Sequence, residues 1–241
     1  MEYNFIFNEK ENLSETDYDK IKKKQNLVRN NFETVGKYNI PIVKKQKLNI
    51  EDLEPWCYSK TKIGDKENER KIIHFFTYDW LYENVYNKPE KTMEKLEQYY
   101  ALMTPDFSLY SDMPLSLQIY NTFKNRWCGA FWQSQGKLVI PTISWSKEES
   151  FEFCFDGVEK GSIVAVSTYR QEKYEKEFMN GYNKMLEIIQ PLKVLCYGEP
   201  FKDMGDNVIF LDPFNKKELI KKIGVEEFTR KYLAGELYPT N

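Results

Sequence analysis

The fragment Lys137-Leu-Val-Ile-Pro-Thr-Ile-Ser-Trp145 joins an apolar run to a tail of small polar residues. Gly136 precedes the run and marks the turn from which it starts. A short apolar run bounded in this way is typical of a buried strand in a parallel sheet. The fragment therefore predicts a central strand that carries Thr142, Ser144 and Trp145 to one end of the sheet.

Two other apolar runs also stop at polar residues. One ends with Asp106 and Ser108, and the other ends with Ser167 and Thr168. The carboxyl ends of parallel strands lie at one edge of a sheet, and ligands bind there. We therefore expect the polar side chains of the three runs to form a common site.

Segments typical of strands and helices alternate along the chain. Further strands are predicted within Ile72–Asp79, Lys193–Glu199 and Asn207–Asp212, and helices over 113–127 and 171–190. Five or six strands separated by helical segments predict an α/β fold with a mostly parallel sheet and helices on both faces. The sequence leaves open whether this sheet is open and doubly wound or curls into an incomplete barrel.

The first part of the chain differs in composition from the rest. It is polar and rich in Lys and Asn, and it leads into a segment from Pro41 to Tyr58 that we expect to be extended. We therefore predict a polar N-terminal arm with this extended segment over residues 1–58, and an α/β core domain over residues 59–241. The basic clusters Lys20–Lys24 and Lys44–Lys47 either contact nucleic acid or a partner protein, or form solvated surface.

Composition and charge exclude several classes of protein. The 241 residues are 41% hydrophobic and 16% aromatic, which argues against a disordered chain. The net charge of −2 gives no overall attraction to nucleic acid or to anionic lipid. Apolar runs reach only about eight residues, whereas a membrane-spanning helix needs roughly 20. We expect a cytoplasmic protein that has no membrane partner.

The chain has four cysteines and one histidine. Cys57, Cys128, Cys154 and Cys196 are widely spaced, which predicts reduced thiols and neither a zinc site nor a disulfide framework. His74 lies inside an apolar strand, which is typical of a core or edge histidine. The sequence has no glycine-rich dinucleotide motif, phosphate-binding loop or serine-hydrolase elbow.

Carboxylates at strand ends are the candidate catalytic residues: Asp106, Asp79 and Glu199. Carboxylates that share a dry cleft also share protons, so that one of them has a raised pKa and can act as an acid. The same oxygens can bind a divalent cation, which is the one cofactor that the sequence suggests, although no set of metal ligands is predicted. Each of these residues can instead cap a helix or form a turn.

The candidate ligand-binding residues are polar or aromatic. Trp145 and Tyr197 offer faces on which a sugar or a base can stack, and Arg126 and Lys173 are candidate clamps for an anion. The complete set of candidate ligand-binding residues is Ser108, Arg126, Trp127, Ser144, Trp145, Ser167, Thr168 and Tyr197.

Several of these residues lie in segments that resemble a known family. The segments are Thr104-Pro-Asp-Phe-Ser-Leu-Tyr110, Met113-Pro114, Asn125-Arg-Trp127, Val139-Ile-Pro-Thr-Ile-Ser-Trp145 and Val164-Ala-Val-Ser-Thr168. In them the chain resembles domain-of-unknown-function family 4417 (DUF4417), over roughly Ile72 to Pro200. This family occurs mainly in bacteria, phages and other mobile elements of Gram-positive hosts. The resemblance therefore implies a phage or mobile-element context and no particular activity.

Two functions fit these observations. We expect a regulatory or binding protein that acts on a recombination or replication protein, or on DNA, with a protein partner from a phage or mobile element. The alternative is an acid- or metal-assisted hydrolase of a nucleotide, sugar or nucleic acid that uses the carboxylates at the strand ends. Carboxylates close together in a concave pocket would favour the hydrolase, and scattered carboxylates would favour the binding protein.

Overall fold

The computed structural model describes residues 17, 20, 29, 32–50, 53–212 and 223–234. The chain divides into two compact units, residues 1–33 and residues 34–241. Most of the polar N-terminal segment, including the basic cluster after Lys20, lies outside the described residues. The predicted domain boundary between residues 58 and 59 stays a prediction.

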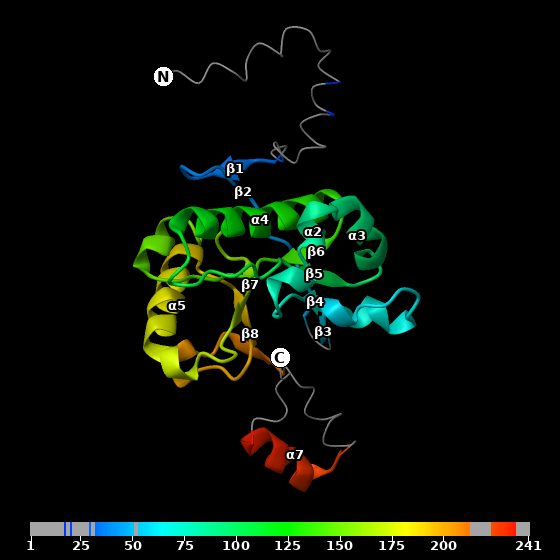
Figure 1. The fold of residues 1–241 in the computed structure, drawn as a ribbon, viewed down its shortest axis with the longest axis vertical. Helices are drawn as coiled ribbons and strands as arrows, with labels where there is room; N and C mark the ends of the chain where they lie inside the picture. Colours follow the sequence, from blue (N-terminus) through cyan, green and yellow to red (C-terminus); the bar gives the residue numbers. More distant parts are fainter. Residues whose placement is uncertain are drawn as a thin grey trace. The chain divides into compact units, whose positions relative to one another are not determined.

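Seven parallel strands form the centre of the second unit (Figure 1). Four of them form one sheet in chain order and three form another, and a short antiparallel pair, β1 (Thr34–Val35) and β2 (Ile40–Pro41), precedes them. The first sheet contains β3 (Glu54–Cys57), β4 (Lys71–His74), β5 (Ala101–Met103) and β6 (Leu138–Ile140), and the second contains β7 (Ile163–Ser167), β8 (Lys193–Tyr197) and β9 (Val208–Leu211).

A parallel bridge between Thr142 and Ala165 joins the two sheets. The amide of Ile143 donates to the carbonyl oxygen of Ala165 at 2.8 Å, and the amide of Ala165 donates to the carbonyl oxygen of Pro141 at 2.8 Å. The seven strands therefore form one array, in which each strand lies beside the strand that precedes it in the sequence.

The α/β class and the parallel sheet are confirmed, with more strands than the five or six predicted. The additional strand is β3, which lies in the segment predicted to be extended. Its residues pair in register with β4, from Glu54 opposite Lys71 to Cys57 opposite His74. The sequence Glu-Pro-Trp-Cys carries no apolar run, so its pairing could not be recognised from hydrophobic pattern.

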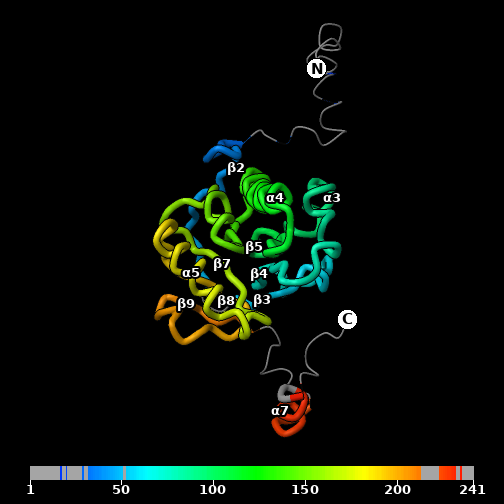
Figure 2. The backbone as a smooth tube through the Cα atoms, turned by 60° about the vertical axis from the view of Figure 1, so that its left-hand side comes forward, coloured from blue at the N-terminus to red at the C-terminus, as the bar shows by residue number. Residues whose placement is uncertain are grey.

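The array curls, so that strands that are distant in the strand order face each other across a shared interior. Ile72 of β4, Ile140 of β6 and Leu195 of β8 belong to one buried cluster. In a flat sheet, β4 and β8 would lie roughly 19 Å apart, because neighbouring strands are about 4.8 Å apart. Phe76, which follows β4, nevertheless stacks on Tyr197 of β8 with ring centroids 4.7 Å apart. Of the two arrangements left open, this curled array corresponds to the incomplete barrel (Figure 2).

The helices lie outside the curled sheet. The α-helices are α2 (Asn84–Asn87), α3 (Pro89–Leu96), α4 (Leu115–Ser134), α5 (Glu175–Ile189) and α7 (Val225–Leu233), and the short 3-10 helices are η1 (Tyr58–Lys60), η2 (Lys66–Arg70), η3 (Asp79–Leu81), η4 (Glu148–Glu152), η5 (Glu172–Tyr174) and η6 (Lys202–Met204). No helix within the described part of the chain combines the length and the apolar character needed to cross a membrane.

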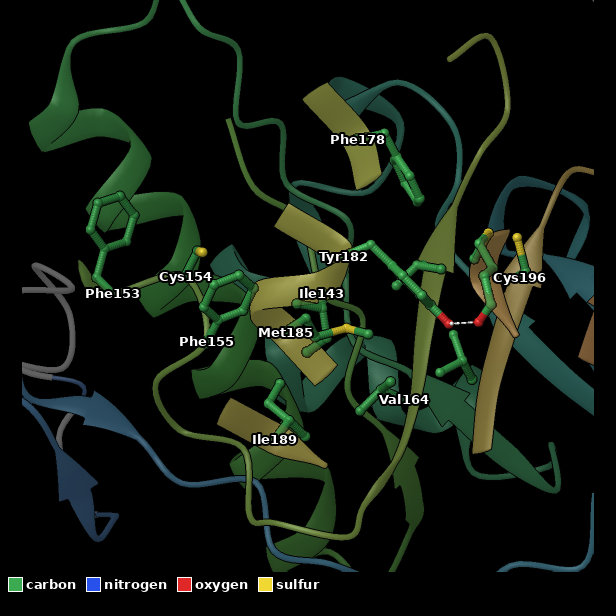
Figure 3. Close-up of a cluster of buried hydrophobic side chains, with 13 residues drawn as sticks. Ile143, Phe153, Cys154, Phe155, Val164, Phe178, Tyr182, Met185, Ile189 and Cys196 are labelled. Carbon is green, nitrogen blue, oxygen red and sulfur yellow. Dashed lines mark hydrogen bonds between the residues drawn. The ribbon is translucent and has the colours of Figure 1, made fainter. Parts of the chain in front are cut away.

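Helix α5 packs on the outer face of β7 and β8 (Figure 3). Its buried residues recur every three or four positions, which is the spacing of one helix face. Tyr182, Met185 and Ile189 pack with Val164 and with Cys196 in this cluster. Side chains alternate between the two faces of a strand. Neighbouring residues of β7 and β8 therefore serve two cores, one inside the barrel and one under α5.

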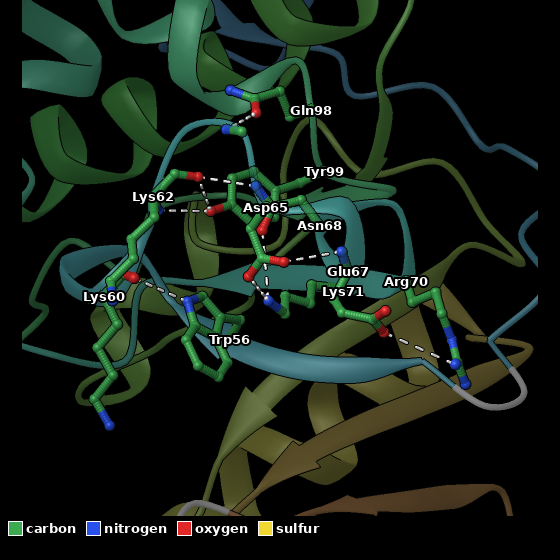
Figure 4. A network of polar contacts seen from close by, with 11 residues as sticks. Trp56, Lys60, Lys62, Asp65, Glu67, Asn68, Arg70, Lys71, Gln98 and Tyr99 are labelled. Atoms are coloured by element: carbon green, nitrogen blue, oxygen red, sulfur yellow. Dashed lines mark hydrogen bonds and ion pairs between the residues drawn. The ribbon is translucent and has the colours of Figure 1, made fainter.

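A polar network surrounds the start of β4 (Figure 4). Lys71 is 4% exposed, and its ammonium group donates to Asp65 at 2.9 Å and lies 4.5 Å from the centre of the Trp56 ring. The bond from Lys71 lowers the pKa of Asp65. A buried cation needs such partners because burial removes its hydration. The network therefore holds the segment before β4 against β3.

Candidate functional site

A pocket of about 370 Å³ opens at the carboxyl ends of β4 to β7. Its walls come from the residues that follow each of these strands and from the first turns of α5. Five of the predicted site residues line it together: Asp106, Ser108, Ser144, Trp145 and Ser167. The functions of these residues stay predictions, and the geometry places them within reach of a single ligand.

Asp106 contributes a carboxyl group to the wall of this pocket. Burial raises its pKa to about 6, a hydrogen bond from the Ser144 hydroxyl lowers it, and the negative charge of Asp79 raises it. A carboxyl group with a pKa near 6 is able to donate a proton and to take it back close to neutral pH. Asp106 therefore combines a raised pKa with a place in the pocket lining.

Asp79 lies behind Ser108 and does not line the pocket. Its carboxylate accepts hydrogen bonds from the amide of Ser108 at 3.0 Å and from the hydroxyl of Ser108 at 2.9 Å. The hydroxyl of Tyr82 lies 3.0 Å from the same carboxylate and 2.6 Å from the carbonyl oxygen of Asp106. Burial raises the pKa of Tyr82, so its hydroxyl keeps its proton. Asp79 and Tyr82 therefore fix the loop that carries Asp106.

Trp145 enters the pocket from the side of α5. A Cβ atom placed on Gly181 would lie 2.2 Å from two atoms of the indole ring. The glycine therefore allows the ring to lie directly against the helix backbone. The ring also packs against Phe178, with centroids 5.0 Å apart. The position of Trp145 is thus set by a notch in α5.

Arg126 and Trp127 lie on α4 and outside the lining of the pocket. Arg126 is 2% exposed, and its guanidinium group donates to the carbonyl oxygens of Thr142, Cys154 and Asp156 at 2.9, 2.7 and 3.0 Å. Burial lowers its pKa to about 10. These bonds tie α4 to the segments that follow β6 and η4. Lys173, the other predicted anion clamp, is exposed on η5.

Thr168, Tyr197 and Glu199 are also outside the pocket lining. The hydroxyl of Thr168 donates to the carbonyl oxygen of Glu199 at 2.8 Å, while the side chain of Glu199 is exposed. Tyr197 packs in the barrel between His74 and other aromatic rings. Burial lowers the pKa of His74 to about 3, so this histidine is neutral.

Sequence reasoning missed the aromatic residues of the pocket. Tyr78, Tyr110, Tyr169 and Tyr174 line it beside the predicted residues. Arg170 also lines it, and its backbone has a φ of 61°, which is uncommon for a residue with a side chain. All these residues lie within a few positions of a predicted strand end, and that position is the signal that could have found them.

Among the residues that the structure places, no three His, Cys, Asp or Glu side chains come together as a metal site requires. The divalent cation suggested by the sequence stays a prediction.

The chain is an α/β protein whose parallel strands lie side by side in chain order. Its pocket, at the carboxyl ends of these strands, has the size of a small ligand. The chain belongs to the family described as Domain of unknown function (DUF4417), whose model matches residues 32–215. The match confirms the resemblance found in the sequence segments around the pocket, and it extends beyond them at both ends.

Two relatives come from phages. The Gene 1 protein of Mycobacterium phage L5 is 36% identical over 175 residues, which cover 71% of this chain and 76% of the relative. The Gene 1 protein of Mycobacterium phage D29 is 41% identical over 161 residues, which cover 62% of this chain and 60% of the relative. No solved structure matches the chain.

Proposed function

We propose that this protein is a hydrolase that cleaves a glycosidic bond in a sugar or a nucleoside, with Asp106 as the acid. Asp106 is the one predicted catalytic carboxylate in the pocket lining, so the proposal rests on this single acid and not on a cluster of carboxylates. The observation that carries it is the position of Asp106: a carboxyl group with a raised pKa forms part of a pocket lined by hydroxyl groups and aromatic rings. The volume of about 370 Å³ suits a small ligand.

In the proposed reaction, protonated Asp106 donates its proton to the leaving oxygen or nitrogen as the glycosidic bond breaks. A water molecule adds its oxygen to the sugar carbon, and the proton that this water loses restores protonated Asp106. Such an acid contributes typically 10²- to 10⁴-fold to the rate. The hydroxyls of Ser108 and Ser146 are suited to bind sugar hydroxyls, and Trp145 is suited to stack on a ring.

Asp106→Asn tests the proposal, because asparagine keeps the shape of the side chain and cannot donate an acidic proton. We expect the variant to lose at least about 100-fold in kcat on a panel of nitrophenyl glycosides and nucleosides that wild type cleaves. Asp112→Asn is the matched control, because Asp112 is exposed and outside the pocket lining. Unchanged kcat in Asp106→Asn, or no cleavage of the panel by wild type, would contradict the proposal.

The binding or regulatory role expected from the sequence stays a prediction. Its support is the phage origin of the relatives and the exposed lysines of the Lys44–Lys47 segment. Binding of duplex or single-stranded DNA that is lost when Lys44, Lys45 and Lys47 are all changed to Ala would favour this role, whatever the result for Asp106.

A further inference from the structure

Exposed aromatic side chains gather at the pocket. Six large aromatic side chains are exposed among the described residues. Three of the six, Tyr78, Tyr110 and Tyr174, line the pocket. A fourth, Trp80, stacks on Tyr78 with ring centroids 6.1 Å apart and 12° between the ring planes. Aromatic surface therefore continues from the wall of the pocket onto the outside of the protein.

Trp80 is the most exposed of the large hydrophobic side chains in the described part of the chain, at 73%. It lies in η3, directly after Asp79, whose carboxylate accepts hydrogen bonds from Ser108 at the pocket. Contiguous exposed apolar surface commonly marks a binding site. The Tyr78–Trp80 pair thus offers a flat aromatic surface to a part of the ligand that lies beyond the pocket.

The charges around the pocket distinguish between two candidate ligands that stack on aromatic rings: a single-stranded nucleic acid and an uncharged polymer. Single-stranded nucleic acid stacks its bases on aromatic rings, but it also needs a positively charged groove along its backbone. Protonated Asp106 is neutral, so the charged side chains in the pocket lining are one acidic residue, Glu177, and one basic residue, Arg170, and the lining has no excess of positive charge.

The basic Lys44–Lys47 segment lies near the opposite end of the strands. The ammonium group of Lys45 contacts the carbonyl oxygen of Lys160 before β7, and the side chain of Gln46 contacts the carbonyl oxygen of Lys137 before β6. The described cations of this segment are therefore not placed to accompany a polymer across the pocket. An uncharged chain fits the local charges better.

We infer that the substrate is a chain of uncharged sugars, of which one unit occupies the pocket and the next units stack on Tyr78 and Trp80. This inference rests on the proposed function and names its substrate class. Sugar rings present apolar faces that pack on aromatic rings, and their hydroxyls bind carboxylates and serine hydroxyls.

The test measures how affinity depends on chain length. Malto-, cello- and chito-oligosaccharides of one to five units are titrated calorimetrically into wild type, Trp80→Ala and Ile63→Ala. Ile63 is the matched control because it is 70% exposed and outside the pocket lining. We expect at least one series to gain tenfold or more in affinity between one and four units in wild type and in Ile63→Ala. Trp80→Ala should lose this gain and keep the affinity for a single unit.

Two results would overturn the inference: affinity that does not rise with length in any series, or tighter binding of oligothymidylate than of every sugar. The proposed function fails separately. Cleavage of single-unit glycosides that depends on Asp106, without a gain from chain length, would reject the sugar chain and keep the hydrolase. A gain from chain length that Trp80→Ala removes, without any cleavage, would reject the hydrolase and keep the sugar chain.

Discussion

The carboxyl group of Asp106 is held in surroundings that disfavour its charged form. Its pKa is about 6 in the folded protein and 3.8 for the ordinary group, so the folded state binds the proton more tightly than the unfolded state. The contribution of Asp106 to the free energy of unfolding is therefore greatest below about pH 4, and it is lost as the pH rises through about 6. The same burial that raises the pKa of Asp106 thus destabilises the fold at neutral pH.

Asp106→Asn should remove this pH dependence. We expect the variant to be more stable than wild type at pH 8 by about 1 to 2 kcal/mol, with the difference disappearing near pH 4. Urea unfolding of both proteins at several pH values measures the difference, and the comparison cancels the titration of other groups. Equal stability of the two proteins at pH 8 would show that the carboxyl group titrates normally.

The sequence predicted the positions of some site residues and not of others. The strand-end rule brought Asp106, Ser144 and Trp145 together, because parallel strands deliver their last residues to one edge. It could not show that Arg126 is buried, because its carbonyl partners come from segments far along the chain. Nor could it show that Asp79 lies behind Ser108, since that depends on a loop conformation.

At the scale of single elements, the notch in α5 is unusual. Glycine within a helix costs about 1 kcal/mol relative to alanine. Gly181 is tolerated here because any side chain at this position would meet the indole of Trp145. The helix therefore gives up some intrinsic stability in order to fix an aromatic wall of the pocket.

Gly181→Ala should consequently destabilise the protein by about 1 to 3 kcal/mol, although alanine favours the helix. In a Trp145→Phe background the loss should shrink, because the smaller ring leaves room for a methyl group. Urea unfolding of the four proteins in this double-mutant cycle measures the coupling. Lys176→Ala, at an exposed position of the same helix, is the control for helix propensity. A stabilising Gly181→Ala would mean that the notch is not needed.

The ends of some helices could not be predicted from sequence patterns. The helix predicted over 113–127 continues to Ser134 in α4. Glycine weakens a helix in general, but Gly129 lies where a Cβ atom would meet Thr104 and Val43 at 2.7 Å. Close packing against the residue that follows β5 and against the segment after β2 therefore allows the helix to continue past the glycine. Such packing cannot be seen in local hydrophobic spacing.

At the scale of the whole molecule, the two sheets share one interior. Ile72 and Met103 of the first sheet pack in the same cluster as Ala165 and Leu195 of the second. Chain order predicted neighbouring parallel strands, but the curl of the array depends on side chains that meet across it. The sequence therefore indicated the sheet and left its closure undecided.

Because the interior is shared, the second unit should unfold in one cooperative step. Trp56, Trp80, Trp127 and Trp132 lie in or beside the first sheet and report on it by fluorescence in a Trp145→Phe variant, which removes the fifth tryptophan, packed against Phe178 of α5. Far-ultraviolet circular dichroism reports on helices of both halves, including α5. We expect the two signals to give the same urea midpoint. Separate midpoints would show that the sheets are independent.

The agreement between chain order and strand order also has a consequence during synthesis. The ribosome releases β3 to β6 before β7 to β9 have been made, so the apolar inner surface of the first sheet lacks its partners from the second sheet at that stage. Incomplete chains with such surfaces are prone to aggregate. We therefore expect chains that stop before Leu195 and Leu211 to aggregate more readily than the full chain.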